Sequence, residues 1–260
     1  MIGAILGDII GSRFEFSKVR NKSEDFELFT DKCEFTDDTV LTIATMDSIL
    51  NDIPFDKSYS YWGNKYPTCS YGSRFRDWLE DDIKEPYYSY GNGSAMRVSP
   101  IGFAYNDLKT VMDKAEESAI VTHNHDEGIK GAEAVAVCIY LARNKTPKKI
   151  IKEIIETYFD YDLSRKLEDI RPYYQFNETC QGSVPESIIC FLEGNGFEDC
   201  IRKVISLGGD TDTMGAIVGG IAEAYYGVPI TFKVSLCEIQ LPKEMNIIIN
   251  NFYEKYGNQQ

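Results

Sequence analysis

The chain is 260 residues long and carries 41 acidic against 27 basic side chains, which gives a net charge of −14. That balance argues against a nucleic-acid backbone or an anionic membrane as the main partner, although a basic pocket for a phosphate-bearing small molecule is still compatible with it. With 43% hydrophobic and 13% aromatic residues the chain can build a sizeable core, which excludes disorder.

Neither the cysteines nor the hydropathy pattern indicates secretion or membrane insertion. The seven cysteines include no C-x-x-C pair and no zinc-ligand pattern. The N-terminal apolar run meets Asp8 too early for a signal peptide, and no run of about 18 apolar residues could span a bilayer. We therefore expect a protein of the reducing cytoplasm. No repeat or linker divides the chain, so we expect one domain over residues 1–260.

The first candidate site residues are two acids near the N-terminus. Gly7, Asp8 and Gly11 form a Gly-Asp-x-x-Gly motif, and Glu15 follows it. Asp8 and Glu15 are seven residues apart, so two turns of a helix would carry both on one face. Asp8 is also compatible with a simple helix cap. Glu15 stands between two phenylalanines, where burial would raise its pKa into the range of an acid or base catalyst; otherwise it is a solvated surface acid.

A cluster of hydroxyl and carboxylate side chains opens the next predicted element. Thr36, Asp37, Asp38 and Thr39 lead into an apolar run with helical spacing over residues 39–50. Asp and Thr are ordinary helix N-caps, and acids in a first turn complement the helix dipole. A cap needs only one side chain, however, and this cluster supplies four polar candidates.

Residues 55–90 differ in character because aromatic side chains are concentrated there, with Arg74 and Arg76 among them. Glycine and proline in this segment favour loops with short helices, which could form a flap beside a pocket. The simpler interpretation is that the aromatics fill a secondary core under a long loop, since burial is their usual role.

A loop of small residues ending in a cation follows, with the sequence Tyr90-Gly91-Asn92-Gly93-Ser94-Ala95-Met96-Arg97. Residues that tolerate positive φ would let successive N–H groups point inward as an anion nest, a plausible seat for a pyrophosphate. A glycine loop by itself is a weak signal, because most such loops are simple turns.

The two histidines of the chain lie together as Thr122-His123-Asn124-His125, just before a predicted buried helix over residues 128–143. Histidines two residues apart could ligate a metal, but no other soft ligand lies nearby. A hydrogen bond from one histidine to the substrate is the second interpretation. A local capping role for the loop is the third.

A second acidic cluster stands far along the chain, as Gly208-Gly209-Asp210-Thr211-Asp212-Thr213. The two glycines would permit the tight approach that brings Asp210 and Asp212 to a shared site.

The helix predicted after this cluster, over residues 213–226, carries three glycines. Glycine is costly inside a helix, so we expect another helix backbone to approach closely there. Further helical patterns occupy residues 148–159, 186–192, 197–207 and 245–256, whereas strand-like alternation is scarce. We therefore predict an all-α fold, a compact single-domain bundle of many helices with the active site on loops at helix N-termini.

The two acidic clusters together predict a metal centre. Carboxylates and hydroxyls without Cys or His beside them form a hard oxygen ligand set, suited to Mg²⁺ or Mn²⁺ rather than zinc. If the two helix starts meet in the fold, four aspartates converge. Their mutual repulsion then calls for a metal ion, or a pair of them, as compensation.

Taken in order, these motifs resemble the ADP-ribosylglycohydrolase family, of the dinitrogenase reductase-activating glycohydrolase and ADP-ribosylhydrolase type. The resemblance runs along most of the chain, from the motif around Asp8 to the cluster at Asp210. It implies an all-α enzyme with a dinuclear Mg²⁺ centre, sometimes Mn²⁺, that hydrolyses the N- or O-glycosidic bond between ADP-ribose and a protein side chain. The substrate would be an ADP-ribosylated protein or a small ADP-ribose conjugate.

The resemblance also implies roles for single residues. Glu15 would sit beside the metals near the reacting ribose, and one of Asp37, Asp38 and Glu15 would steer the proton. The implied metal ligands are Thr36, Asp37, Asp38, Asp210, Asp212 and Thr213. The residues implied to contact the pyrophosphate, the distal ribose and the rest of ADP-ribose are Gly91, Asn92, Gly93, Ser94, Ala95, Met96, Arg97 and His123.

Two alternatives stay open at this level. One is a Mg²⁺-dependent hydrolase of another ADP-ribose compound or nucleoside-type ligand, working through the same centre. The other is a non-catalytic ADP-ribose-binding protein on the same fold, which the full set of acidic ligands argues against. The sequence does not specify whether the acceptor is arginine, serine, another side chain or a base.

Overall fold

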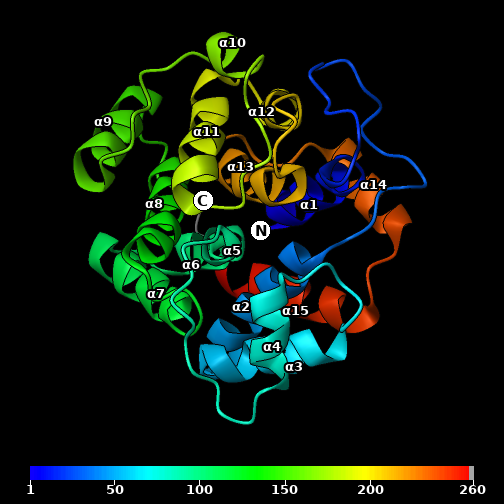
Figure 1. Cartoon of the computed structure of the whole chain (residues 1–260), viewed down its shortest axis with the longest axis vertical. Helices are drawn as coiled ribbons and strands as arrows, with labels where there is room; N and C mark the ends of the chain where they lie inside the picture. The colour runs from blue at the N-terminus through cyan, green and yellow to red at the C-terminus, as the bar shows by residue number, and fades with distance from the viewer. Residues whose placement is uncertain (258–260) are drawn as a thin grey trace.

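The computed structural model describes residues 1–257, and every regular element in that range is helical (Figure 1). The extended pairing found there is an isolated bridge between Gly91 and Thr179. The predicted all-α fold class is therefore confirmed, whereas the last three residues of the predicted domain 1–260 lie outside the described range. In chain order the helices are α1 (Ile2–Glu15), α2 (Asp37–Asn51), α3 (Phe55–Lys65), α4 (Ser73–Glu80), α5 (Gly93–Met96), α6 (Ser99–Ala104), α7 (Leu108–Ile120), α8 (Asp126–Arg143), α9 (Lys148–Phe159), α10 (Leu167–Ile170), α11 (Cys180–Glu193), α12 (Phe197–Ile205), α13 (Thr211–Tyr226), α14 (Ile230–Ile239) and α15 (Lys243–Tyr256).

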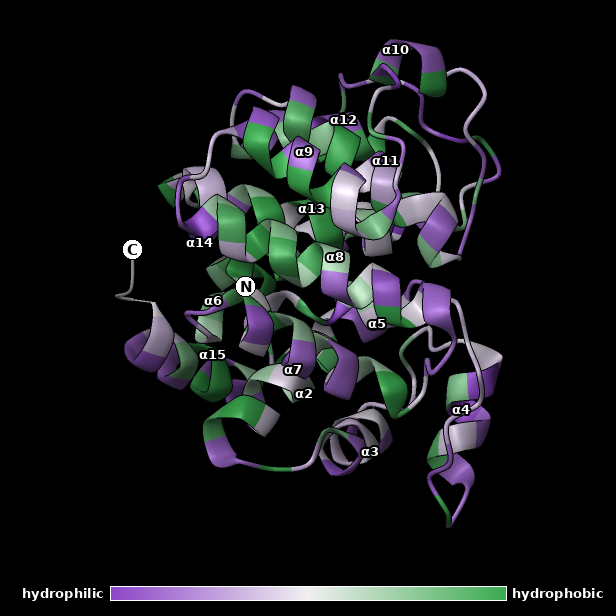
Figure 2. Cartoon of the chain, turned by 90° about the vertical axis from the view of Figure 1, so that its left-hand side faces the viewer, coloured by the Kyte–Doolittle hydropathy of each residue, from purple (hydrophilic) through white to green (hydrophobic). Residues whose placement is uncertain are grey.

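Helices α1 and α13 lie side by side at the centre of the molecule (Figure 1). Every residue of α13 from Thr211 to Ala224 is buried, because α1, α8, α11 and α12 pack around it. In Figure 2, which is coloured by hydropathy, α8 and α13 are largely apolar. Helix α4 lies at the edge of the molecule in the same view.

Glycines set the distance between α1 and α13. A Cβ atom on Gly7 would lie 1.9 Å from the backbone oxygen of Gly215, and one on Gly3 would lie 2.2 Å from that of Gly219. No side chain fits at these positions, so the close helix approach expected from the glycines of α13 is confirmed, and its partner is α1. The pairing is antiparallel, which places Glu15, at the end of α1, beside the first turn of α13.

The helices predicted from periodicity are present, with ends that differ by a few residues. Only the segment predicted over residues 186–192 differs more, because α11 already begins at Cys180. The Thr179 side chain caps this helix by accepting a hydrogen bond from the Gly182 N–H. Pro185 lies within α11, and a proline normally indicates a helix start or break, which explains the late predicted start. The other predicted segments lie in α2, α8, α9, α12, α13 and α15.

The aromatic side chains of this segment are buried, as the simpler interpretation predicted, but in the same hydrophobic core as the other helices and not in a secondary one. Residues 70–76 of the segment also line the cleft described below, as the interpretation of a flap beside a pocket expected. Tyr59 and Trp62 of α3 are buried, as are Tyr71, Phe75 and Trp78 in and before α4. The rings of Phe75 and Trp78 stack with centroids 5.3 Å apart. Phe75, Trp78 and Leu79 attach α4 to this core at the edge of the molecule.

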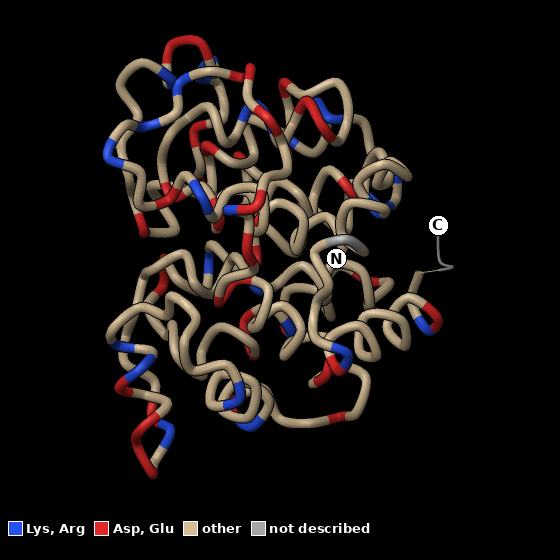
Figure 3. Tube along the Cα trace, turned by 90° about the vertical axis from the view of Figure 1, so that its right-hand side faces the viewer, with Lys and Arg blue, Asp and Glu red and all other residues tan. Residues whose placement is uncertain are grey.

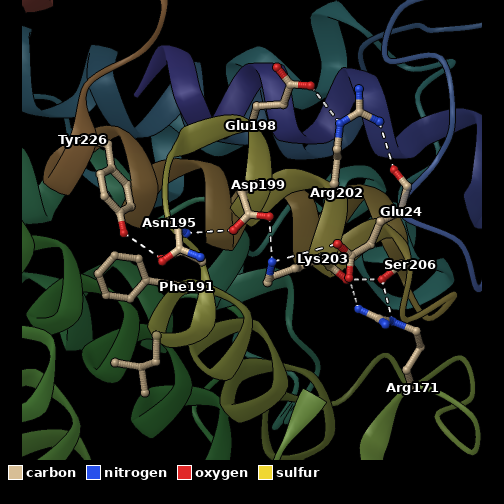
Figure 4. Close-up of polar contacts among 12 residues, drawn as sticks. Glu24, Arg171, Phe191, Asn195, Glu198, Asp199, Arg202, Lys203, Ser206 and Tyr226 are labelled. Carbon is tan, nitrogen blue, oxygen red and sulfur yellow. Dashed lines mark hydrogen bonds and ion pairs between the residues drawn. The ribbon is translucent and has the colours of Figure 1, made fainter. Parts of the chain in front are cut away.

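The loop between α1 and α2, residues 16–36, is tied to α12 (Figure 4). Arg202 Nη1 donates hydrogen bonds to the backbone oxygens of Glu24 and Phe26, at 3.0 and 2.8 Å. The Glu24 carboxylate pairs with Arg171. These contacts fix the path of the chain toward the N-terminus of α2, where the first acidic cluster stands.

No helix within residues 1–257 has both the length and the apolar character that a membrane crossing requires. Acidic and basic residues are interspersed over the outer elements (Figure 3). All seven cysteines are free thiols, and Cys138, Cys180, Cys190 and Cys200 are buried.

Candidate metal centre and substrate cleft

The first acidic cluster begins α2, and only its threonine acts as a cap. Thr36 is the N-cap residue, and its Oγ1 accepts a hydrogen bond from the Asp38 N–H at 3.3 Å. Asp38 is only 2% exposed, and its Oδ1 has no hydrogen-bond partner. A buried carboxylate oxygen without a partner is costly, so capping alone does not account for this cluster.

Asp8 does not cap its own helix, because α1 already begins at Ile2. The expectation of a local cap was wrong for this residue. Its fully buried carboxylate instead accepts hydrogen bonds from the backbone N–H groups of Thr36 and Thr39, both at 3.0 Å, and from their hydroxyls. Asp8 therefore holds the N-terminus of α2 against the middle of α1.

The second acidic cluster begins α13, where Asp212 Oδ1 accepts a hydrogen bond from the Thr213 N–H at 2.9 Å. Asp210 is in the N-cap position but makes no side-chain cap; its Oδ2 accepts from Asn92 Nδ2 at 2.8 Å. Thr213 Oγ1 donates to Asp38 Oδ2 at 3.3 Å, which links the two clusters directly. Gly208 has φ of +63°, and a Cβ on Gly209 would lie 2.4 Å from Tyr174. The two glycines therefore stand where the chain is tightly packed, against Asn21 and Tyr174, while their role in bringing Asp210 and Asp212 together stays a prediction.

The acids converge in two groups that share one residue. Asp8, Asp38 and Asp212 form one group, and Glu15, Asp210 and Asp212 form the other. Within each group, one carboxylate oxygen per residue lies within 4.8 Å of the others. Two adjacent groups that share Asp212 could hold two cations, and their oxygen atoms suit Mg²⁺ or Mn²⁺.

Burial and mutual repulsion raise the pKa values of these carboxyl groups. Burial, followed by the neighbouring aspartates, raises the pKa of Asp38 and of Asp212 well above the usual range. Burial raises the pKa of Glu15 to about 8 and that of Asp37 to about 7. It also raises the pKa of Asp8 to about 6, although hydrogen bonds from Thr39 and Thr36 oppose this shift. Glu15 is thus a buried acid with a raised pKa, as one of its two interpretations predicted, and not a solvated surface acid.

All members of the acidic groups except Asp8 line a cleft with a volume of about 530 Å³. The glycine loop and His123 lie along the same cleft, so the structure brings together residues from widely separated parts of the sequence. Of the sequence-predicted site residues, those that line the cleft are Glu15, Asp37, Asp38, Gly91, Asn92, Gly93, Met96, Arg97, His123, Asp210, Asp212 and Thr213. Thr36, Ser94 and Ala95 do not line it.

The glycine loop does not form the predicted anion nest by positive φ. Among the described glycines only Gly208 and Gly227 have positive φ. Gly93 is instead the first residue of the short helix α5, and a Cβ there would lie 3.1 Å from His123 Nε2. The glycine is small so that His123 can approach the loop. Sequence alone could not distinguish a need for space from a need for positive φ.

Several polar side chains of the glycine loop bond to the protein itself. Ser94 Oγ donates to the backbone oxygen of Gly128 at 2.7 Å. Asn92 holds Asp210, as described above, and Arg97 is 0% exposed. The Arg97 Nη2 atom donates to Thr122 Oγ1 at 2.8 Å. These contacts attach the loop rigidly to the metal centre on one side and to the end of α7 on the other.

The two histidines have different surroundings. His125 Nδ1 accepts a hydrogen bond from the Glu127 N–H at 3.0 Å and caps α8, so the local capping interpretation is confirmed for this residue. His123 lines the cleft, and its Nδ1 lies 2.7 Å from Thr122 Oγ1. Neither histidine belongs to the acidic groups found among residues 1–257.

Sequence reasoning did not identify several residues of the cleft and of the acidic groups. Asp8 was noted in its motif but not as a member of the centre; its seven-residue spacing from Glu15 was the available signal. Tyr90 is 46% exposed and lines the cleft, and Phe176 and Glu178 line it from the segment before α11. No local pattern distinguished these three from ordinary loop residues.

The fold and the site define an all-α protein whose acidic centre of carboxylate and hydroxyl oxygens lines a cleft. The sequence pattern of the ADP-ribosylglycohydrolase family matches residues 1–259, and the chain belongs to that family. It is accordingly an enzyme of the ADP-ribosylglycohydrolase class, as the sequence motifs indicated.

Relatives of known type agree with this assignment. The chain is 29% identical to the ADP-ribosylhydrolase ARH3 of Gallus gallus, over 100% of this chain and 93% of that protein. It is also 29% identical to the ADP-ribosylhydrolase ARH3 of Homo sapiens, over 92% of this chain and 88% of that protein. A solved structure, of an ADP-ribosylglycohydrolase-related protein complex, is similar with a TM-score of 0.75 at 21% identity. It covers 98% of this chain and 95% of that one, and this likeness shows the fold alone.

Proposed function

We propose that this chain is a dinuclear Mg²⁺-dependent hydrolase that removes ADP-ribose from modified protein side chains by cleaving an N- or O-glycosidic bond. The observation that carries this proposal is the pair of buried acidic groups that share Asp212, a residue that lines the cleft. A small ADP-ribose conjugate would use the same site.

The proposed ligands for two Mg²⁺ ions, or Mn²⁺, are Thr36, Asp37, Asp38, Asp210, Asp212 and Thr213. The donor set supports this assignment because it contains only carboxylate and hydroxyl oxygens. The unpartnered Asp38 Oδ1 supports it as well, since a cation would satisfy that atom. Asp8 belongs to one acidic group, but hydrogen bonds already occupy both its oxygens. When bound, the cations would orient the ribose hydroxyls and a water molecule and neutralise the cluster.

Three acids, Asp37, Glu15 and Asp38, are proposed to accept or donate the proton during hydrolysis. Asp37 is half-buried, lines the cleft and belongs to neither acidic group. A carboxylate has two oxygens, so Asp37 can bind a cation through one of them and accept a proton from an attacking water through the other. Glu15 has its pKa raised to about 8 by burial, the condition for a carboxyl that donates a proton near neutral pH. Asp38 interacts electrostatically with both of them and with Asp8. We propose that these residues steer the proton as the glycosidic bond breaks.

Another part of the cleft is proposed to hold the rest of ADP-ribose. Gly91, Gly93 and His123 would contact the pyrophosphate and the distal ribose, and Ser94, Ala95 and Arg97 would support that loop from beneath. Arg74, an exposed arginine of α4, also lines the cleft and supplies positive charge there. The half-exposed ring of Tyr90, next to this loop, is the proposed seat of the adenine.

A paired substitution tests the proposal. We expect Asp212→Asn to lower the release of ADP-ribose from a modified protein by at least about a thousandfold, because both cation positions lose a ligand. Asp47→Asn is the matched control: Asp47 is a buried acid of α2 that accepts from Trp62 Nε1 at 2.8 Å, outside the acidic groups. That variant should keep its activity. Near-native turnover by Asp212→Asn would contradict the proposal.

The substrate panel separates the alternatives. Arginine-, serine- and base-linked ADP-ribose should each be tested with Mg²⁺, with Mn²⁺ and with a chelator. Free ADP-ribose and intact acceptor indicate glycosidic cleavage, whereas AMP would indicate attack on the pyrophosphate of another ligand. Turnover that persists in chelator would refute the metal-dependent mechanism.

A further inference from the structure

Arg97 is a fully buried arginine without a carboxylate partner within residues 1–257. Its guanidinium carbon lies 4.1 Å from the centre of the Tyr59 ring, and its Nη2 donates to the Ser118 backbone oxygen at 3.0 Å and to Thr122 Oγ1 at 2.8 Å. Its Nε and Nη1 atoms have no hydrogen-bond partner. Such burial is costly, which suggests a role for Arg97 beyond packing.

Thr122 connects this arginine to His123. Arginine N–H groups can only donate, so Thr122 Oγ1 is the acceptor in its bond with Arg97. The same hydroxyl lies 2.7 Å from Nδ1 of His123. Arg97 occupies one of the two lone pairs of the hydroxyl, and the threonine proton can then be donated to Nδ1. Nδ1 is then the acceptor, and the proton of the neutral imidazole is on Nε2.

The Nε2 atom faces the glycine loop. A Cβ on Gly93 would lie 3.1 Å from it, and one on Gly91 would lie 3.6 Å from it. We propose that Arg97, acting through Thr122, is a positioning residue that fixes His123 in its Nε2–H tautomer and so presents a hydrogen-bond donor to a substrate oxygen beside Gly91 and Gly93. The part of this inference that concerns the substrate rests on the proposed function.

Because the His123 imidazole is held neutral, its tautomer decides whether it presents a donor or an acceptor to the substrate. Burial, and then the positive charges of Arg97 and Arg74, hold the pKa of His123 well below its usual range. The ring is therefore neutral near pH 7 and offers a single N–H. The Tyr87 hydroxyl also interacts with Thr122, so the competing arrangement sends the threonine proton to Tyr87 and leaves the His123 proton on Nδ1. In that arrangement the ring would present an acceptor to the substrate.

Nitrogen NMR of the imidazoles distinguishes the two arrangements without any substrate. The chain has only two histidines, so long-range ¹H–¹⁵N spectra of histidine-labelled protein contain two ring systems, and His125→Asn assigns them. We expect a protonated-nitrogen shift on Nε2 of His123 and an unprotonated shift on Nδ1. In Thr122→Val this pattern should change toward Nδ1–H or a mixture, and Thr122→Ser should restore it. A proton on Nδ1 of His123 in the native protein would overturn the inference.

Kinetics test the consequence for the substrate. We expect Thr122→Val to lower kcat/KM about tenfold, the value of one well-placed hydrogen bond, and Thr122→Ser to recover most of it. Ser118→Ala is the matched control, because the buried Ser118 hydroxyl donates to the Ala115 backbone oxygen and not to the ring. It should change neither the NMR pattern nor kcat/KM. Arg97→Met should shift the tautomer as Thr122→Val does; the threonine variants suffice where the arginine variant fails to fold.

The outcomes separate this inference from the proposed function. If turnover requires Asp212 but Thr122→Val keeps both the native NMR pattern and the native kcat/KM, the relay is refuted and the hydrolase assignment stands. If the Nε2–H pattern is found but no ADP-ribose compound binds or is cleaved, the proposed function fails, and with it the substrate contact of His123.

Discussion

At the scale of single residues, the carboxylates of the acidic centre differ in their hydrogen bonds. Asp8 is bonded by the N–H groups and hydroxyls of Thr36 and Thr39, whereas Asp38 keeps one buried oxygen without a partner. Residues of the same type in the same centre therefore have different roles. The Asp8 carboxylate fixes the N-terminus of α2, and the free oxygen of Asp38 is available to a ligand.

Replacing Asp38 with asparagine tests this division. In chelator near neutral pH, we expect Asp38→Asn to raise the free energy of unfolding by about 1–2 kcal/mol. Burial raises the pKa of Asp38 well above its usual range, so this carboxyl ionises more readily in the unfolded chain, and asparagine removes that difference. The same change should abolish activity and reduce the stabilisation by Mg²⁺. Thermal unfolding in chelator and in Mg²⁺ measures both effects. Asp47→Asn should instead lower stability, since its carboxylate is paired with Trp62, and a lower melting temperature for Asp38→Asn in chelator would contradict this prediction.

At the scale of elements, the centre depends on how closely α1 and α13 approach. The last turn of α1 carries Glu15, and the first turn of α13 carries Asp212. The two carboxylates can share a site only because glycines allow the backbones to touch farther along the same helix pair. Helix packing thus determines the geometry of the acidic centre.

Gly7→Ala tests the element scale. The new Cβ would lie 1.9 Å from the Gly215 backbone oxygen, so the helices must separate, and we expect a loss of more than about 3 kcal/mol in the free energy of unfolding. Mg²⁺ affinity should fall as well, because Glu15 of α1 belongs to the same acidic group as Asp210 and Asp212. Gly196→Ala is the control, since a Cβ there meets nothing within 4 Å. Chemical denaturation and Mg²⁺ titration give both values; equal effects of the two variants would argue against the close packing.

At the scale of the whole molecule, a negative protein concentrates acids at its centre as well as on its surface. The net charge is −14, and the acidic groups around Asp212 are buried. Burial raises the pKa of Asp8 to about 6, of Asp37 to about 7 and of Glu15 to about 8. In the unfolded chain such groups ionise near pH 4.

These shifts predict how stability depends on pH and on metal. Between about pH 4 and pH 8 the metal-free folded chain binds more protons than the unfolded chain, so the contribution of the cluster to stability falls as pH rises. Cations replace those protons, and Mg²⁺ should therefore raise the melting temperature more at about pH 8 than at about pH 5.5. Melting curves with Mg²⁺ and with chelator at both pH values measure this difference. Asp212→Asn should reduce it, and a larger effect of Mg²⁺ at the lower pH would refute the prediction.

The sequence by itself determined the helices and the chemistry of the acidic clusters. Both are local properties: periodicity and N-cap residues act over a few positions, and a Thr-Asp-Asp-Thr run is rich in oxygen ligands wherever it folds. The buried surroundings of Glu15 could be anticipated in the same way, from the phenylalanines beside it.

Only the tertiary structure decided which of these residues meet and what each one contacts. Asp8 of α1 accepts hydrogen bonds from the start of α2, and Asn92 donates to Asp210. Arg97, the last residue of the glycine loop, is buried. The glycine of α5 proved to give space to His123, not positive φ. Each of these contacts joins groups that are distant along the chain, and their free energy depends on distance and burial in three dimensions, which no local pattern records.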